Sequence, residues 1–258
     1  MLRIRSEQME VFGQASLEAF EDNMIEYLRN FSPKHAQVLD EEQLRTVVRY
    51  GIERAEHYAL TSERSIRIYT ETMLMLGGNF DTDSQYPWAA EILGRTEEDQ
   101  VARVDNVSDK AWEYADHVIA DFKRLEEEPY KTRLMDELGG LRKGASEPLV
   151  SSGLSRFYEA VIARLEELFP RKCEYLGELG LRRLINRGLE LAGSYGLNSE
   201  RDASVMVVMM FVLGSGFDRD PLAPWASRIL RSDEKITAGE KIDRLYKEAL
   251  AVLKLWWA

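Results

Sequence analysis

Two short acidic motifs are the strongest candidates for chemistry in this chain. They read Asp81-x-Asp83 and Asp218-x-Asp220. Alternating carboxylates open the calcium loop of an EF-hand, which also needs glycine at its sixth position and glutamate at its twelfth. Tyr86 stands at the sixth position counted from Asp81, and the second motif fails in the same way. We therefore predict carboxylates that form turns and cap helices.

Other reactive side chains are sparse and badly spaced for catalysis or metal binding. Glu53 and His57 are four residues apart, whereas a ferritin-like di-iron site needs Glu-x-x-His pairs. Cys173 follows an arginine and a lysine, and nearby cations lower a thiol pKa. No glycine elbow or repeated histidine accompanies it, however, so we predict a structural cysteine. We expect no catalytic residue, no metal site and no cofactor.

The composition argues against polyanionic partners. The chain has 258 residues, with 34 Lys and Arg against 45 Asp and Glu, which gives a net charge of −11. Such acidity opposes binding to nucleic acid. The longest apolar run is 205–213, whereas a membrane span needs about 20 residues. Because the first residues show no secretory signal pattern, we expect a cytoplasmic protein, with export by a signal-independent machine left open.

An internal repeat is the most informative feature. Residues 44–93 align without a gap to residues 181–230, at an offset of 137, and 21 of the 50 positions are identical. We interpret this as a tandem duplication. It predicts a first helical unit with its N-terminal helix at 1–126, a connector at 127–153 and a second helical unit at 154–258.

The residues shared by the two copies form a structural signature. We expect Arg64 to bridge to Asp83, and Arg201 to Asp220. Glycines in the middle of a helix predict a close crossing with another helix, since glycine there costs about 1 kcal/mol relative to alanine. The signature consists of Gly51, Glu53, Arg64, Phe80, Asp81, Asp83 and Trp88 in the first copy, and Gly188, Glu190, Arg201, Phe217, Asp218, Asp220 and Trp225 in the second.

Every periodic segment has helical spacing, so we predict an all-α fold of two homologous units with pseudo-two-fold symmetry. The segment 199–213 is apolar on all sides and should be an interior helix. Gly196 is suited to a left-handed helix end, and its equivalent Ala59 would adopt that conformation with strain.

Two adjacent tryptophans, Trp256 and Trp257, stand at the end of the printed sequence. Neighbouring residues on a helix point about 100° apart, so both are hard to bury at a helix terminus. Either a groove in the first unit receives one of them, or they form an interface with a partner.

The repeat patterns resemble a known group of proteins. The motifs are Tyr-Gly-Leu-x-Ser-Glu-Arg-Asp at 195–202 and Phe-Asp-x-Asp-Pro-x-x-Pro-Trp-Ala-x-x-Ile-Leu at 217–230, together with the opening Ile-Arg-Ser-Glu-Gln-Met at 4–9. They resemble uncharacterised helical bacterial proteins encoded beside PAAR or VgrG spike genes and effector genes of type VI secretion systems. The resemblance implies a secretion context and no catalytic residue.

Three functions remain open at this point. The first is a non-enzymatic protein-binding module, an accessory or adaptor that holds a secretion spike or effector component. The second is an immunity protein that neutralises a toxin, because an acidic surface suits a basic toxin cleft. The third is an effector enzyme, which a groove between the units holding a strongly perturbed carboxylate would favour.

Overall fold

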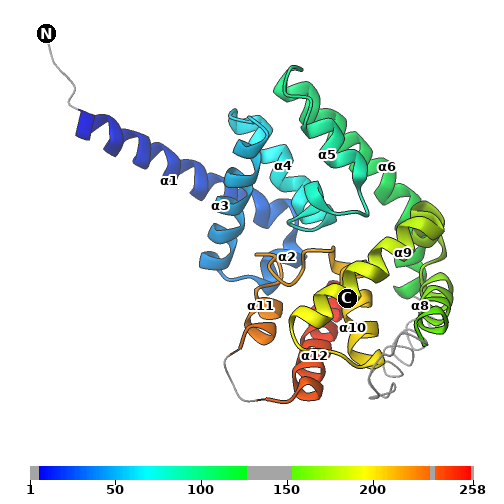
Figure 1. Ribbon diagram of the computed structural model, residues 1–258. Coiled ribbons are helices and arrows are strands. Elements are labelled where there is room, and N and C mark those ends of the chain that lie inside the picture. The colour runs from blue at the N-terminus through cyan, green and yellow to red at the C-terminus, as the bar shows by residue number, and fades with distance from the viewer. Residues whose placement is uncertain (1–5, 127–152, 233–235, 257–258) are drawn as a thin grey trace, which may run out of the picture.

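The computed structural model describes residues 6–126, 153–232 and 236–256, and every regular element in these ranges is a helix (Figure 1). The predicted all-α class is therefore confirmed. The predicted connector lies outside the described residues except for Gly153. The first part of the chain contains α1 (Ser6–Phe31), α2 (Pro33–Val38), α3 (Glu41–His57), α4 (Glu63–Leu76), the short η1 (Phe80–Thr82), α5 (Pro87–Leu93) and α6 (Gln100–Glu126). The second part contains α8 (Leu154–Leu168), α9 (Pro170–Ser194), α10 (Glu200–Leu213), α11 (Pro224–Leu230) and α12 (Ala238–Trp256).

Each part of the chain buries its own hydrophobic core. The first core is built from residues between Met24 and Val118, and the second from residues between Phe157 and Leu253. Leu222 is the exception, because it belongs to the second part and packs in the first core. The two cores are therefore separate, but at least one side chain of the second part packs in the first core.

Two pairs of helices have bounds separated by the offset of the sequence alignment. The bounds of α4 and α10 differ by the repeat offset at both ends, as do those of α5 and α11. Ser62 and Ser199 cap α4 and α10 by accepting a hydrogen bond from the third helical residue. Gly77 and Gly214 end the same helices with φ of 102° and 98°.

The turn before each of these helices has the predicted conformation. Gly196 has φ of 70° and Ala59 has φ of 54°, so the alanine does adopt the left-handed backbone. In both turns the next leucine N–H, from Leu60 or Leu197, bonds back to an alanine carbonyl five residues earlier. Ala59 therefore adopts the same backbone conformation as Gly196, at the expense of local strain.

The two mid-helix glycines mark close helix crossings, as predicted. A Cβ on Gly51 would lie 2.6 Å from the Thr70 hydroxyl, and a Cβ on Gly188 would lie 2.5 Å from a Val207 methyl group. The first contact joins α3 to α4, and the second joins α9 to α10. Glycine is required because the helices approach too closely for a side chain.

The predicted interior helix is α10. All of its residues except Glu200 and Val212 are buried. By contrast, α4 keeps Arg67 and Glu71 on a partly exposed face, where they pair with each other. The pair of equivalent helices therefore differs in environment as the sequence predicts.

Candidate functional site

The acidic motifs meet at the junction between the two parts of the chain. Asp83 accepts hydrogen bonds from the backbone N–H and the hydroxyl of Ser215, each at 2.6 Å. Asp220 accepts one from the N–H of Gly78 at 2.7 Å. Gly78 and Ser215 are themselves separated by the repeat offset, so the contact is reciprocal. Each aspartate also accepts an N–H two residues further along the chain, as in an Asx turn.

The predicted ion pairs to these aspartates are wrong. Arg64 pairs with Asp105 at 3.0 Å, and Arg201 pairs with Asp243. Both arginines reach the long helix that closes their part of the chain, α6 or α12. The aspartates of the loops are instead committed to backbone donors of the opposite part, and spacing in the sequence does not reveal such long-range donors.

The other two signature aspartates are buried within their own parts of the chain. Asp81 pairs with Arg54, and Asp218 accepts a hydrogen bond from the Tyr195 hydroxyl at 2.8 Å. Phe80 and Phe217, beside them, are almost wholly buried core residues. These side chains stabilise the two loops rather than a common site.

The remaining signature residues are scattered. Glu53 and Glu190 lie on exposed helix faces. Trp88 donates its indole N–H to the Tyr175 hydroxyl at 2.9 Å, while Trp225 is buried in the second core. The structure therefore does not bring the residues that are identical in the two aligned segments together in one catalytic site.

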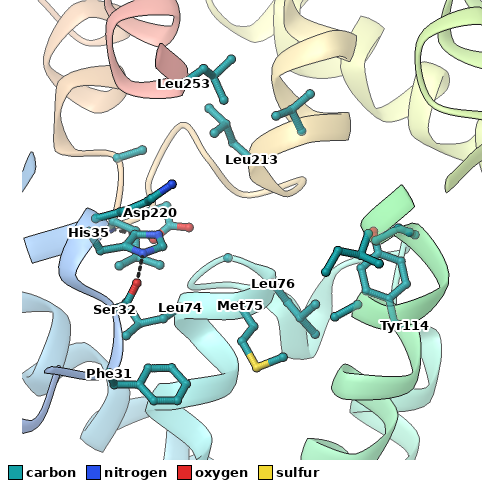
Figure 2. A pocket seen from close by; sticks show the side chains of 18 of the residues that line it. Phe31, Ser32, His35, Leu74, Met75, Leu76, Tyr114, Leu213, Asp220 and Leu253 are labelled. Atoms are coloured by element: carbon teal, nitrogen blue, oxygen red, sulfur yellow. Dashed lines mark hydrogen bonds between the residues drawn. The ribbon is translucent and has the colours of Figure 1, made fainter. Parts of the chain in front are cut away.

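A pocket of about 780 Å³ opens beside the junction, and side chains from both parts of the chain line it. Its lining is mostly apolar. Leu213 and Leu253 lie on one side of the hollow, and His35, Leu76 and Tyr114 lie across from them (Figure 2). This volume falls in the range of about 300–1,000 Å³ that is typical of ligand pockets.

Ten of the 22 residues that line the pocket fall into five pairs separated by 137 or 138 positions in the sequence. The pairs are His35 and Lys172, Met75 and Val212, Leu76 and Leu213, Tyr86 and Ala223, and Ala115 and Leu253.

Several polar side chains line the pocket, among them Ser32, His35 and Lys172. Ser32 and His35 share a hydrogen bond of 2.6 Å between Oγ and Nδ1. Burial lowers the pKa of His35 to about 4, so its imidazole is neutral near pH 7. Lys172 is buried, and its ammonium donates to the Phe211 carbonyl and lies 4.6 Å from the centre of the Phe211 ring.

Asp220 is a perturbed carboxylate in the groove between the units. Burial raises its pKa to about 6, against the lowering effect of the hydrogen bonds from Leu222 and Gly78. Each of its two oxygens already accepts a backbone N–H. Asp220 therefore lines the pocket and, through the hydrogen bond from Gly78, also joins the two parts of the chain.

An exposed apolar stripe continues from the pocket along α6. Ile119 lines the pocket and is 42% exposed, and Trp112, two turns earlier on the same helix face, is 53% exposed. Ala115 lies between them and also lines the pocket. Exposed large apolar side chains beside an apolar hollow are typical of a protein interaction site.

Cys173 is a structural cysteine, as predicted. It is buried in the second core, and desolvation raises the pKa of its thiol to about 12. A thiol with such a pKa is almost wholly protonated near pH 7 and is a poor nucleophile.

Within the described ranges, no three histidine, cysteine, aspartate or glutamate side chains come together as a metal site would require. None of the described helices combines the length and apolarity needed to cross a lipid bilayer. The side chain of Trp256 and the whole of Trp257 lie outside the described part of the chain, so their predicted interface stays a prediction.

Sequence reasoning missed the pocket residues, above all His35, Lys172 and Ile119. The repeat register pairs His35 with Lys172, but the two types differ, so an identity search passes over them. Comparison with protein-family models, curated proteins and solved structures finds no match to this chain. The site must therefore be interpreted from its own geometry.

Proposed function

We propose that this protein is a non-enzymatic protein-binding module, an accessory or adaptor that holds a spike or effector component of a type VI secretion system. The single observation that supports the binding role is the open apolar pocket with the exposed stripe of Trp112 and Ile119 beside it. The secretion context rests on the sequence resemblance alone.

We also propose that the chain arose by tandem duplication, with its halves related by a pseudo-two-fold axis near Gly77 and Gly214. Three observations support this proposal. The bounds of α4 and α10 differ by 137 at both ends, Asp83 and Asp220 each accept a hydrogen bond from the opposite half, and ten pocket residues form pairs at nearly the same offset. A duplicated unit of this kind creates its pocket only where the two copies meet.

The occupant of the pocket is, in this proposal, the apolar face of a helix on a basic partner. An amphipathic helix places an anchor every three or four residues, which matches Ile119, Ala115 and Trp112 along α6. The net charge of −11 steers association with a positively charged protein.

The test is affinity purification from the native cells with mass spectrometry. The wild-type chain should recover a spike or effector component in stoichiometric amount at physiological salt. Ile119→Asp should reduce that recovery at least tenfold, because a carboxylate would be desolvated against the partner. Leu17→Asp is the matched control, since Leu17 is 46% exposed and lies on α1, away from the pocket lining.

Equal loss of the partner in both variants, or recovery of the chain alone, would contradict the proposal. A toxin recovered in stoichiometric amount would instead support the immunity function, which the acidic surface favours. In that case cells that express the toxin should survive only when this chain is present.

One observation favours the enzyme alternative. Ser32, His35 and Asp220 all line the same pocket, and a serine hydroxyl beside a neutral imidazole is the first requirement of a nucleophilic site. Ser32 stands at the N-cap of α2, but its side chain makes no capping hydrogen bond there and bonds His35 instead. His35→Gln would abolish the toxicity of an effector enzyme and leave an adaptor able to bind its partner.

A further inference from the structure

A buried cation stands at one end of the pocket between the two halves. Lys172 lines the pocket and is only 2% exposed. Its ammonium lies 5.9 Å from the centre of the Tyr114 ring and 4.6 Å from the centre of the Phe211 ring. Because Tyr114 also lines the pocket, this charge belongs to the Tyr114 end of the hollow.

The partners of the Lys172 ammonium are neutral. It donates a hydrogen bond to the Phe211 carbonyl, and the two rings offer it only their π faces. Asp121 accepts a hydrogen bond from the backbone N–H of Lys172 at 2.9 Å. In the part of the chain that the structure describes, no carboxylate forms an ion pair with the ammonium. A buried charge is costly unless an opposite charge or enough hydrogen bonds compensate it, so this ammonium is suited to receive an anion.

The other end of the pocket does not suit an anion. His35 and Asp220 lie at the end of the hollow away from Tyr114 (Figure 2). The Asp220 carboxylate is mostly ionised near pH 7, because burial raises its pKa only to about 6. His35 does not offset this charge, because burial lowers its pKa to about 4 and leaves the imidazole neutral. The pocket therefore orients an anionic group towards Lys172.

The rest of the lining is mostly apolar, with Leu76, Val118 and Leu213 among its side chains. Each methylene group buried against such a surface raises the affinity of a ligand about fourfold. The ligand that matches both features of the pocket carries a carboxylate at one end and a flexible alkyl chain behind it.

We propose that this pocket binds a long-chain fatty acid, whose carboxylate accepts a hydrogen bond from Lys172 and whose alkyl chain packs on the apolar lining. The aligned position in the first half holds the neutral His35, so one fatty acid binds per chain. Lys34 lines the pocket as well, but it is an exposed residue of α2. This ligand goes beyond the adaptor function, and a partner helix that docks in the same pocket would compete with it.

The first test is isothermal titration calorimetry of the purified full chain with dodecanoate below its micelle concentration. One equivalent should bind. Dodecylamine and dodecanol have the same alkyl chain, and both should bind about tenfold more weakly or worse, because neither brings a negative charge to the ammonium. Decanoate should bind up to about 16-fold more weakly than dodecanoate, because it buries two methylene groups fewer.

The second test assigns the carboxylate to Lys172. Lys172→Met removes the charge and keeps an apolar side chain of similar length, so dodecanoate should bind about tenfold more weakly or worse. The affinity for dodecanol should change by less than about twofold, since its hydroxyl is uncharged. Lys34→Met is the matched control, a lysine of the same pocket that is exposed to solvent, and it should leave both affinities unchanged.

Several outcomes would overturn the proposal. They are the absence of dodecanoate binding, equal binding of dodecylamine, several weak equivalents per chain as for a surfactant, and a loss in Lys34→Met that matches the loss in Lys172→Met. Circular dichroism checks that each variant is folded, and the comparison of ligands on the wild-type chain decides the question if Lys172→Met is not. Because the chain and the fatty acid are the only components, a failure of the adaptor function would not alter these results.

Discussion

The two halves of this protein contain helices of matching length in different environments. In the first half α4 keeps a partly exposed face, whereas its equivalent α10 is buried on nearly all sides. The first half has His35 at the pocket where the second has Lys172. The backbone contacts at the junction are reciprocal, while the side chains around it have diverged. The two halves therefore resemble each other more in the backbone contacts at their junction than in the side chains around it.

The largest expected effect concerns the two aspartates that join the halves. Asp83 accepts four hydrogen bonds, from Gln85 and Ser215, whereas Asp220 accepts two, from Gly78 and Leu222. Each buried donor left without a partner costs about 1–3 kcal/mol. We therefore expect Asp83→Ala, which loses four hydrogen bonds, to lower the free energy of unfolding by about 4 kcal/mol or more, and Asp220→Ala, which loses two, by about 2 kcal/mol or more.

Urea denaturation of both variants measures this difference. Equal losses would show that the junction is not asymmetric in energy. A single transition that splits into two would show that the halves unfold separately once the junction is broken.

The pH dependence of stability separates the two titrating groups of the pocket. The pKa of Asp220 is about 6 in the folded protein, against 3.8 for an ordinary aspartate, so the folded state binds more protons than the unfolded state between these pH values. Its contribution to the free energy of unfolding therefore falls as pH rises through this window. The pKa of His35 is about 4 when folded against 6.5, so its contribution rises with pH over nearly the same window.

The two contributions oppose each other and should largely cancel in the wild-type chain. In Asp220→Asn the contribution of His35 is no longer opposed by that of Asp220, so stability should fall more steeply than in the wild-type chain on acidification from pH 6.5 to 4, by at most about 1.4 kcal/mol more per pH unit. In His35→Gln stability should fall less steeply than in the wild-type chain over that range, or rise. Thermal unfolding at several pH values tests this, and parallel curves for both variants would contradict it.

The two helix crossings should differ in their tolerance of a methyl group. A Cβ on Gly188 would meet the Cγ2 of Val207 at 2.5 Å and its Cα at 3.2 Å, whereas a Cβ on Gly51 meets only side-chain atoms. Overpacking of this kind costs about 1–3 kcal/mol. We expect Gly188→Ala near the upper end and Gly51→Ala nearer the lower end, because the added methyl at Gly188 also meets the backbone of Val207, whereas the one at Gly51 meets only side-chain atoms. Chemical denaturation measures both values, and a larger loss for Gly51→Ala would reverse the comparison.

The smallest expected effect lies in the two turns. Ala59 has φ of 54° where its equivalent Gly196 has 70°, and a left-handed residue other than glycine carries about 1–2 kcal/mol of strain. Glycine also adds entropy to the unfolded chain, which offsets part of the gain. Ala59→Gly should therefore raise the free energy of unfolding by about 0.5–1 kcal/mol, and Gly196→Ala should lower it by about 1 kcal/mol. Thermal melts of the two variants should shift in opposite directions.

Local features of the fold were predictable because they depend on neighbours in the chain. The helical class, the cap at Ser199, the left-handed Ala59 and the close crossing at Gly188 follow from residue type and spacing. The partners of Asp83 and Asp220 were not predictable in this way. Their donors lie 132 and 142 positions away in the sequence. Neighbouring residues do not indicate which distant backbone N–H will donate a hydrogen bond to a given carboxylate.

The sequence by itself determined that this protein is helical and acidic, because periodicity and charge are properties of the chain. Only the tertiary structure decided where the pocket lies. The lining side chains come from α1, α2, α4, α6, α9, α10 and α12, and they converge only when the two halves meet across Asp83 and Asp220. Packing between distant segments creates such a hollow, and packing is a property of three dimensions that the order of residues does not display.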